Sequence, residues 1–189
     1  MKNEFVKLFE DLGVILDGHF LLTSGKHSPT FLQCSQLMQH PEHTEKVIKE
    51  LAKEFHNTDA EVVVGPAMGG IILSYELARH LGLKAIYAEK SENGMEFRRG
   101  FNIKPGTKVL VVEDAVSTGG SVKKTMEACE KASLDVIGVA IVVDRSNGKV
   151  KLHENQHSLI TLDIPAYDSD DCPLCKENKP LISPKDLSM

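Results

Sequence analysis

Apolar runs rich in valine and isoleucine alternate with helical patterns from residue 60 onward, and this alternation constrains the fold more than any other feature. Helices are expected over Ile71–Leu81 and Gly120–Ala132. Strands are expected over five runs: Glu61–Gly65, Ala85–Glu89, Lys108–Glu113, Val136–Val143 and Leu159–Ile164. Strands with so few polar residues are covered on both faces, as in a parallel sheet between helices. The pattern therefore predicts an α/β fold with a central, mostly parallel sheet flanked by helices.

The residues before this core predict a smaller unit. An amphipathic helix is expected over residues 5–12, ending at Gly13 or Gly18. Short strands are expected over His19–Thr23 and Thr30–Cys34, on either side of a turn-rich loop.

The bulk properties exclude several classes of protein. The 189 residues fit one domain, and a net charge of −5 argues against nucleic acid as the main partner. No stretch approaches the roughly 18 apolar residues of a membrane span, and the N-terminus lacks the apolar core of a signal peptide. Four cysteines without an export signal indicate reduced thiols. We therefore expect a cytoplasmic protein that binds neither nucleic acid nor membrane.

Residues 109–122 carry the clearest chemistry. An apolar strand delivers Glu113 and Asp114 at its carboxyl end, where open α/β sheets bind their ligands. Ser117–Ser121 follow, and a loop of serine, threonine and glycine at the start of a helix can direct backbone N–H groups at a phosphate. The two acids repel a phosphate but can bind ribose hydroxyls, or magnesium through water. A helix start with a solvated cap explains any one of these residues but not the whole pattern.

This segment resembles the phosphoribosyl-pyrophosphate signature of type I phosphoribosyltransferases. In that signature an apolar strand is followed by two acids, two variable residues and Thr-Gly-Gly-Ser or a similar run. The resemblance implies the type I phosphoribosyltransferase fold, with a small N-terminal hood over the base, and phosphoribosyl pyrophosphate as the donor. It also implies that consecutive residues bind this donor: Glu113, Asp114, Ala115, Val116, Ser117, Thr118, Gly119, Gly120 and Ser121.

Four further stretches resemble orotate phosphoribosyltransferases. They are His19–Pro29, Gly65–Gly70, Glu89–Phe101 and Asp144–Ser146. The resemblance implies orotate as the acceptor, bound by Ser117, Arg145, Lys26 and Phe31. Orotate carries a carboxylate, and a fixed guanidinium such as that of Arg145 binds a carboxylate in bidentate geometry. Taken alone, an Asp-Arg pair is more typical of a surface salt bridge.

The resemblance implies that two segments of the chain bind the departing pyrophosphate. One is the loop that contains Met68 and Gly69, where many orotate enzymes have Tyr-Lys. The other is a polar stretch, Ser91–Pro105, that is expected to form a mobile hairpin or lid. The cations at this lid are Lys90, Arg98 and Arg99. The expected catalytic residues are Asp114, Glu113 and Lys90.

The resemblance further implies magnesium as a cofactor and a homodimeric assembly. Magnesium is expected to be carried by substrate and water near Glu113 and Asp114, rather than by direct protein ligands. Residues 1–189 are expected to form a single phosphoribosyltransferase domain. Its parts are the hood over about residues 1–40, the α/β core over about 60–165 and a loosely packed C-terminal extension over about 168–189.

Two other functions stay open at the level of the sequence. A phosphoribosyltransferase for another base, such as a purine or uracil, has the same donor signature but does not need an arginine for a base carboxylate. A regulator that keeps the fold and senses the donor without catalysis is the second alternative. The acidic net charge and the intact acid pair count against such a regulator.

The four cysteines divide into two kinds. Cys172 and Cys175 have half of the spacing of a zinc site, and His153 with His157 offers a second pair nearby in sequence. A predicted strand lies between the two pairs, so a plain C-terminal turn is the favoured interpretation. The other two, Cys34 and Cys129, lie on apolar faces and are expected to be core thiols.

Overall fold

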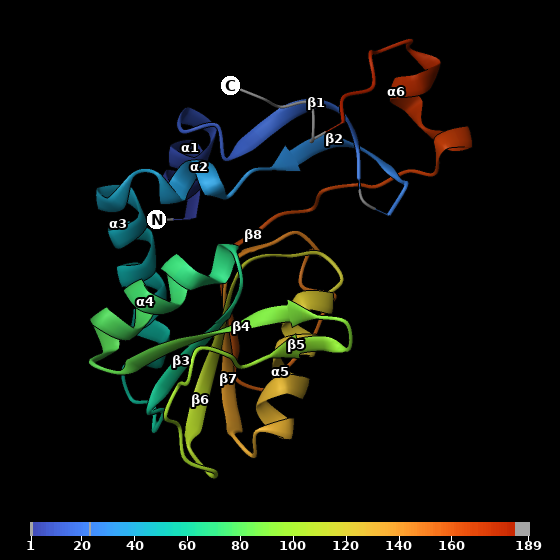
Figure 1. Ribbon diagram of the computed structural model, residues 1–189. Helices are drawn as coiled ribbons and strands as arrows, with labels where there is room; N and C mark the ends of the chain where they lie inside the picture. Colours follow the sequence, from blue (N-terminus) through green and yellow to red (C-terminus); the bar gives the residue numbers. More distant parts are fainter. Residues whose placement is uncertain (1, 23, 184–189) are drawn as a thin grey trace.

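The computed structural model describes residues 2–22 and 24–183. Among these residues a six-stranded sheet forms the core, in the order β5-β4-β3-β6-β7-β8 (Figure 1). Its strands are β3 (Val62–Pro66), β4 (Lys84–Ser91), β5 (Gly94–Glu96), β6 (Lys108–Val116), β7 (Asp135–Asp144) and β8 (Gln156–Thr161). Neighbouring strands are parallel except for β4 and β5. The predicted mostly parallel sheet is therefore confirmed.

Helices cover both faces of this sheet. One layer contains α1 (Lys2–Asp11), α3 (Pro41–Ala52) and α4 (Gly69–Leu81), and the other contains α5 (Gly120–Lys131). A hydrophobic core lies between the sheet and each helical layer, and alternate residues of β6 pack into the two cores. Leu110 and Val112 face the layer of α1, α3 and α4, whereas Val109 and Val111 face α5. Shorter elements are α2 (Ser35–Met38) and a 3-10 turn at Lys53–Phe55. No helix of the described residues is both long and apolar enough to cross a membrane.

The predicted core elements are present, but some bounds differ: β8 begins and ends three residues earlier than the predicted run Leu159–Ile164, and β4 is longer than the predicted Ala85–Glu89. β6 runs to Val116, three residues beyond its predicted end at Glu113. The extension exists because β7 continues beside it, pairing Ala115 with Val143 and Val116 with Asp144. The acid pair therefore lies within a strand and not in the loop after it.

A two-stranded antiparallel hairpin forms the hood. It consists of β1 (Ile15–Leu21) and β2 (His27–Leu32). The predicted strands His19–Thr23 and Thr30–Cys34 both begin several residues too late, and Thr23 lies outside the described residues.

An irregularity in β1 explains this error. The register of the hairpin shifts between Asp17 and Phe20, so the alternation of inward and outward side chains changes phase there. Gly18 lies at this point inside β1 and does not end the first helix, which ends at Asp11.

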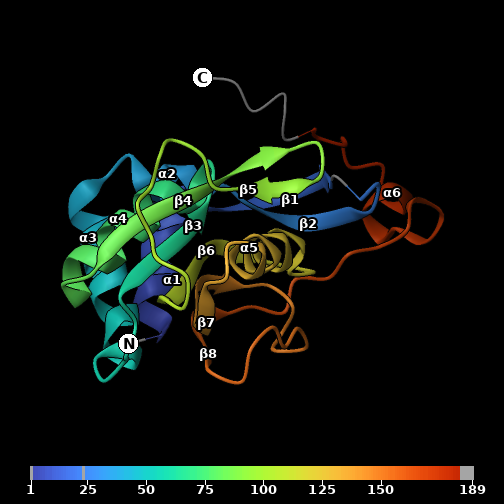
Figure 2. The ribbon, with the colours of Figure 1, turned by 60° about the horizontal axis from the view of Figure 1, so that its bottom comes forward.

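The C-terminal extension is fastened to both edges of the hood. Tyr167 and His27 exchange two backbone hydrogen bonds of 2.8 Å, and Ile182 forms backbone bonds of 2.7 and 3.0 Å with His19 and Leu21. Between these points lie a 3-10 turn at residues 169–171 and α6 (Pro173–Lys176), which lies beside the hairpin in both views (Figures 1 and 2). The extension, predicted to pack loosely, is thus held to the hood at Tyr167 and Ile182 and buries Cys172 and Leu174, while most of residues 168–183 are exposed.

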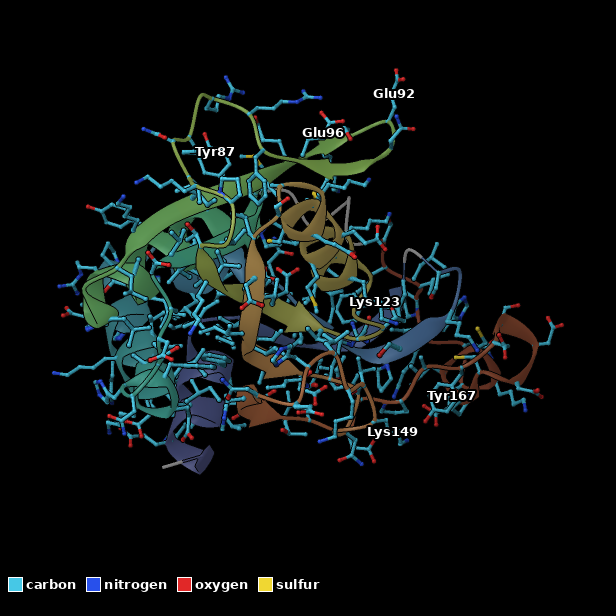
Figure 3. The ribbon with its side chains drawn as sticks, turned by 90° about the horizontal axis from the view of Figure 1, so that it is seen from below. Tyr87, Glu92, Glu96, Lys123, Lys149 and Tyr167 are labelled. Atoms are coloured by element: carbon cyan, nitrogen blue, oxygen red, sulfur yellow. The ribbon has the colours of Figure 1, made fainter. Side chains whose placement is uncertain are left out.

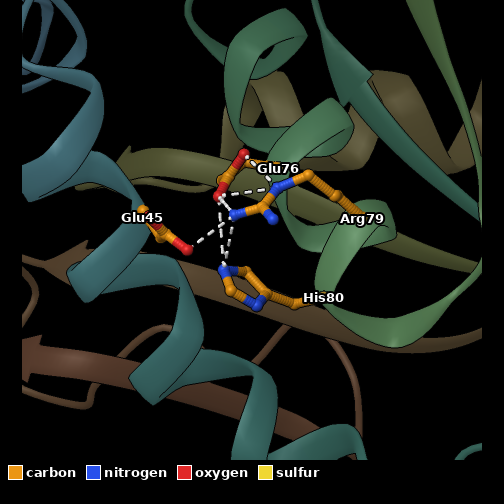
Figure 4. A network of polar contacts seen from close by, with 4 residues as sticks. All are labelled: Glu45, Glu76, Arg79 and His80. Carbon is orange, nitrogen blue, oxygen red and sulfur yellow. Dashed lines mark hydrogen bonds and ion pairs between the residues drawn. The ribbon is translucent and has the colours of Figure 1, made fainter.

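A network of ion pairs joins α3 to α4 (Figure 4). The guanidinium of Arg79 lies 2.6 Å from a Glu76 oxygen and 2.9 Å from a Glu45 oxygen. Nε2 of His80 lies 3.2 Å from the same Glu76 carboxylate. Because Arg79 pairs with a carboxylate on each helix, this cluster connects α3 to α4.

Candidate active site

A cleft of about 420 Å³ lies where β6 ends and α5 begins. Parallel strands present their carboxyl ends at one edge of the sheet, which is where open α/β folds bind ligands. Nine of the predicted residues line this cleft: Lys90, Glu113, Ala115, Val116, Ser117, Thr118, Gly119, Gly120 and Ser121. Side chains from β4 and β6 and the start of α5 therefore surround one site.

The carboxyl groups of the acid pair lie close together near the end of β6. Besides the larger effect of burial, a hydrogen bond between the Glu113 and Asp114 side chains raises the pKa of Glu113 and lowers that of Asp114. Each carboxylate accepts a backbone N–H bond. Glu113 Oε1 accepts from Asp114 at 3.1 Å, and Asp114 Oδ1 accepts from Ala115 at 2.6 Å.

Burial makes both carboxylates harder to ionise. The pKa of Glu113 is raised by burial and then by the negative charge of Asp114, and burial likewise raises the pKa of Asp114. No lysine, arginine or histidine of residues 2–22 and 24–183 forms an ion pair with either acid. The pair is therefore suited to a ligand that brings hydroxyl donors or a cation.

Replacing Glu113 with Gln is expected to raise the free energy of unfolding, and to raise it more at about pH 8 than at about pH 5. An acid whose pKa is higher in the folded state holds more protons when folded, so its burial costs stability as the pH rises above the unfolded pKa. Because burial raises the pKa of Glu113 from 4.5 to about 8 and each pKa unit corresponds to about 1.4 kcal/mol, the gain near pH 8 should be on the order of 4 kcal/mol. Urea unfolding at both pH values measures the difference. A gain that does not depend on pH would contradict the assigned cause.

The loop Ser117–Gly119 and the first turn of α5 form a cradle for an anion. The first N–H groups of a helix have no partners within it, and the helix N-terminus carries partial positive charge. Gly119 caps α5 with a φ of 76°, and a Cβ at this position would lie 2.6 Å from Leu152 Cδ2. Glycine alone satisfies both the left-handed backbone and this close approach.

The loop after β3 lies against the acid pair. A Cβ on Gly69 would lie 2.6 Å from Asp114 Oδ2, so the backbone of the loop approaches this carboxylate directly. The Ala67–Met68 peptide bond is cis, and 82% of the surface of Met68 is exposed. Of the two residues predicted to contact pyrophosphate, Gly69 thus reaches Asp114, whereas the Met68 side chain is open to solvent.

The predicted lid is a hairpin formed by β4 and β5, and it separates the three predicted cations. Lys90 lines the cleft. Arg98 pairs with Glu96 at 3.1 Å and Arg99 pairs with Glu89 at 2.8 Å. In this arrangement the two arginines are held by acids of their own segment and do not reach the cleft.

Arg145 lies directly after the strand that flanks the phosphate loop. Its backbone N–H donates to the carbonyl of Val116 at 2.9 Å, next to Ser117. The Asp144 carboxylate accepts two backbone N–H bonds from the loop that follows, at 2.7 and 3.1 Å. None of the ion pairs of the described residues involves Arg145, and partial burial lowers the pKa of its guanidinium. The Asp-Arg salt bridge that the pair suggests on its own is therefore absent from this part of the chain.

The hood residues predicted for orotate do not line the cleft. Lys26 pairs with Asp168 at 3.1 Å, and the ring of Phe31 lies 5.6 Å from that of Phe20. The hood lies beyond the carboxyl ends of the parallel strands. The chain leaves β8 at this edge of the sheet and continues to Tyr167, which forms backbone hydrogen bonds with His27 of β2. Tyr167 marks this junction in Figure 3.

Lys124 lines the cleft although it was not among the predicted residues. It follows Ser121 by three positions on α5, so helical periodicity places both on one face. This spacing was the signal available in the sequence. Glu92, labelled at the tip of the lid hairpin in Figure 3, also borders the cleft.

Comparison with known proteins gives a consistent result. Residues 33–167 match the phosphoribosyl transferase domain. Over 183 residues the chain is 51% identical to an orotate phosphoribosyltransferase of a Thermoanaerobacter species and 46% identical to one of Desulforamulus reducens. Each alignment spans 97% of this chain and 96% of the relative.

Solved structures share the fold at lower identity. The orotate phosphoribosyltransferase of Aeropyrum pernix has a TM-score of 0.68 at 22% identity, covering 84% of this chain and 93% of that one. An adenine phosphoribosyltransferase of Rhodothermus marinus has a TM-score of 0.57 at 23% identity, covering 70% of this chain and 86% of that one.

These comparisons carry different information. The solved structures establish the type I phosphoribosyltransferase fold, which enzymes for different bases share. The sequence relatives match about half of the residues over nearly the whole chain. At this identity and coverage, the chain belongs to the orotate phosphoribosyltransferase family.

Proposed function

We propose that the chain acts in the cytoplasm as an orotate phosphoribosyltransferase. It transfers the 5-phosphoribosyl group from phosphoribosyl pyrophosphate to orotate, giving orotidine 5′-phosphate and pyrophosphate in the synthesis of pyrimidine nucleotides. One observation carries the proposal: Arg145, without an acid partner among the described residues, lies beside the phosphate loop that follows the acid pair. The acid pair and loop fit the donor, and Arg145 fits a base with a carboxylate.

The donor is held at two points. Its 5′-phosphate, remote from the reacting bond, binds to the loop Ser117–Ser121 and supplies binding energy that positions the sugar. Glu113 and Asp114 accept hydrogen bonds from the ribose hydroxyls. These bonds favour the ionised form of two carboxyl groups whose pKa values burial raises.

The reaction exchanges one bond at the anomeric carbon. The bond to the pyrophosphate oxygen breaks, and a nitrogen of orotate forms the new bond. Positive charge develops on the ribose in the transition state, where the carboxylates of the acid pair can stabilise it. The attacking nitrogen of orotate loses its proton as the new bond forms, and this proton passes to the departing pyrophosphate or to solvent, so no residue of this chain is assigned as a general base.

The departing pyrophosphate accumulates negative charge. Lys90, which lines the cleft, and backbone groups near Gly69 are placed to offset it. We further propose that the β4–β5 hairpin closes over the donor and excludes water. On closure, Arg98 would leave its ion pair with Glu96, and Arg99 its ion pair with Glu89. Both guanidinium groups would then bind pyrophosphate oxygens.

The acid pair also fits magnesium, because two buried carboxylates without a cationic partner among the described residues attract a hard cation. Glu113 and Asp114 would hold it through water and the ribose hydroxyls. When bound, magnesium would neutralise part of the charge on the pyrophosphate.

We propose that two copies of the chain associate along α4. An apolar stripe begins beside the pyrophosphate loop and follows this helix: Met68, Ile72 and Tyr75 are 82%, 46% and 68% exposed. Residues at this spacing share one face of a helix, and large apolar patches of soluble proteins mark contact surfaces. Replacing Tyr75 with Glu should shift the sedimentation coefficient from that of a dimer to that of a monomer.

The function is tested by following the absorbance of orotate. Loss of the orotate signal is expected only when both phosphoribosyl pyrophosphate and magnesium are present. Hypoxanthine, adenine and uracil, offered in place of orotate, should give no product. Turnover of one of these bases but not of orotate would assign a different acceptor, and the absence of turnover with all four would support a regulator.

A further inference from the structure

Two histidines of the hood and two cysteines of the C-terminal extension converge on one point. They are His19, His27, Cys172 and Cys175, and one ligand atom of each lies within 4.8 Å of all the others. The histidines predicted as partners of this cysteine pair, His153 and His157, are not part of the cluster.

The separations within the cluster fit a tetrahedral metal site. His27 Nδ1 lies 3.0 Å from His19 Nε2 and 3.2 Å from Cys175 Sγ. His19 Nε2 lies 3.5 Å from Cys172 Sγ and 3.7 Å from Cys175 Sγ. In a zinc site with Zn–N of about 2.0–2.1 Å and Zn–S of about 2.3 Å, neighbouring ligands stand roughly 3.3–3.8 Å apart. We infer that the hood and the extension together form a structural Cys2His2 site for a zinc ion.

The ligand atoms are already oriented toward the common point. His19 Nδ1 lies 2.9 Å from the carbonyl oxygen of Lys179, which can only accept a hydrogen bond. The proton of the ring therefore sits on Nδ1, and the lone pair of Nε2 faces the cluster. A backbone carbonyl behind a histidine is the usual support of a metal ligand. His27 is held through its two backbone bonds with Tyr167.

Burial indicates a structural and closed site. His19, His27 and Cys172 are 2%, 6% and 0% exposed, and Cys175 is partly exposed. No position is left for a substrate when all four ligands surround one ion, whereas catalytic zinc keeps an open position. Soft thiolates together with imidazole select zinc over magnesium or calcium.

Two arrangements without a metal leave more groups unsatisfied. A proton on His27 Nδ1 can bridge the two rings, but both thiols then have only weak hydrogen bonds in a buried place. A disulfide between the cysteines, which are free thiols in the structure, leaves the rings facing each other without a cation. A zinc ion engages all four atoms, and the two thiols release their protons to solvent as it binds.

The site lies outside the matched transferase domain. All four residues lie outside residues 33–167, the part that matches the phosphoribosyl transferase domain. The ion would join β1 and β2 to a segment about 150 residues later in the chain. It would thereby fix the hood, which carries Lys26 and Phe31, without touching the acid pair.

The inference is tested on the full chain, purified without a histidine tag and without chelator. Metal analysis should give about one zinc ion per chain. Removal of zinc with a chelator should lower the Tm, and zinc alone should restore it. Hydrogen exchange should increase on zinc removal in residues 168–182 and in β1 and β2, while β6 and α5 stay protected. Co2+ in place of zinc should show the visible absorption of a tetrahedral site with thiolate ligands.

Variants assign the ligands. Cys175→Ser and His19→Asn should each lose at least nine tenths of the bound zinc, whereas the matched changes Cys34→Ser and His153→Asn should retain it. If a ligand variant fails to fold, the zinc content and the zinc-dependent Tm of the unmodified chain decide the question. Protein without zinc that gains no stability from added zinc would overturn the inference. A disulfide between Cys172 and Cys175 in the purified protein, detected by mass spectrometry, would do the same.

Discussion

Replacing Asp114 with Asn is expected to lower kcat/KM for phosphoribosyl pyrophosphate by about 100-fold or more while the protein stays folded. The Asp114 carboxylate lies beside the backbone of Gly69, and its sequence neighbours Glu113 and Ala115 line the cleft. Its negative charge can therefore act on the ribose as positive charge develops there. Asn keeps the size and one acceptor oxygen but removes the charge. Stability should not fall, because burial disfavours the ionised form of Asp114.

A matched change separates this effect from a general loss of negative charge. Asp135 begins β7 at the opposite edge of the same sheet and is exposed, so Asp135→Asn should leave kcat/KM unchanged. Initial rates over a range of donor concentrations, with orotate in excess, give the comparison. Turnover of Asp114→Asn close to that of the unmodified enzyme would remove the acid from its proposed role at the ribose.

Replacing Arg145 with Leu should lower kcat/KM for orotate by about 100- to 1,000-fold, with little change in the KM for the donor. A pocket that pairs a guanidinium with a carboxylate loses both the charge and the bidentate bonds in this variant. Arg145→Lys keeps the charge but not the planar geometry, so we expect an intermediate loss.

The control is the same arginine-to-lysine change at Arg79, which connects α3 with α4 outside the cleft. Arg79→Lys should leave the kinetics for both substrates unaltered. Uracil lacks the carboxylate, so the preference for orotate over uracil should shrink in both Arg145 variants. Equal losses for donor and acceptor would instead indicate that Arg145 maintains the shape of the loop.

The sequence predicted the sheet and its flanking helices well for a physical reason. Buried strands of a parallel sheet are apolar on both faces, so their runs stand out, and the phosphate loop must follow one of them directly. The sequence also placed Lys90 and Ser117 in one site, as the cleft has them. The extra length of β6 could not be predicted, because it depends on its pairing with β7.

The errors arise where contacts join distant parts of the chain. The irregularity at Gly18 shifts the alternation of β1, and a pattern search then begins the strand too late. The partners of Cys172 could not be found by spacing, since His19 lies 153 positions away. The ion pairs that hold Arg98 and Arg99 depend on how the lid hairpin folds back on itself.

The fastening of the hood by residues 167–182 has a consequence for the order of synthesis. The hairpin β1–β2 leaves the ribosome before the α/β core, but the segments that border both of its edges are translated only after that core. During that interval the core can form its sheet and its phosphate loop. The outer backbone groups of β1 and β2 have no hydrogen-bond partners from the C-terminal extension until it is translated. The growing chain therefore acquires the means to bind the donor before it completes the cover for the base.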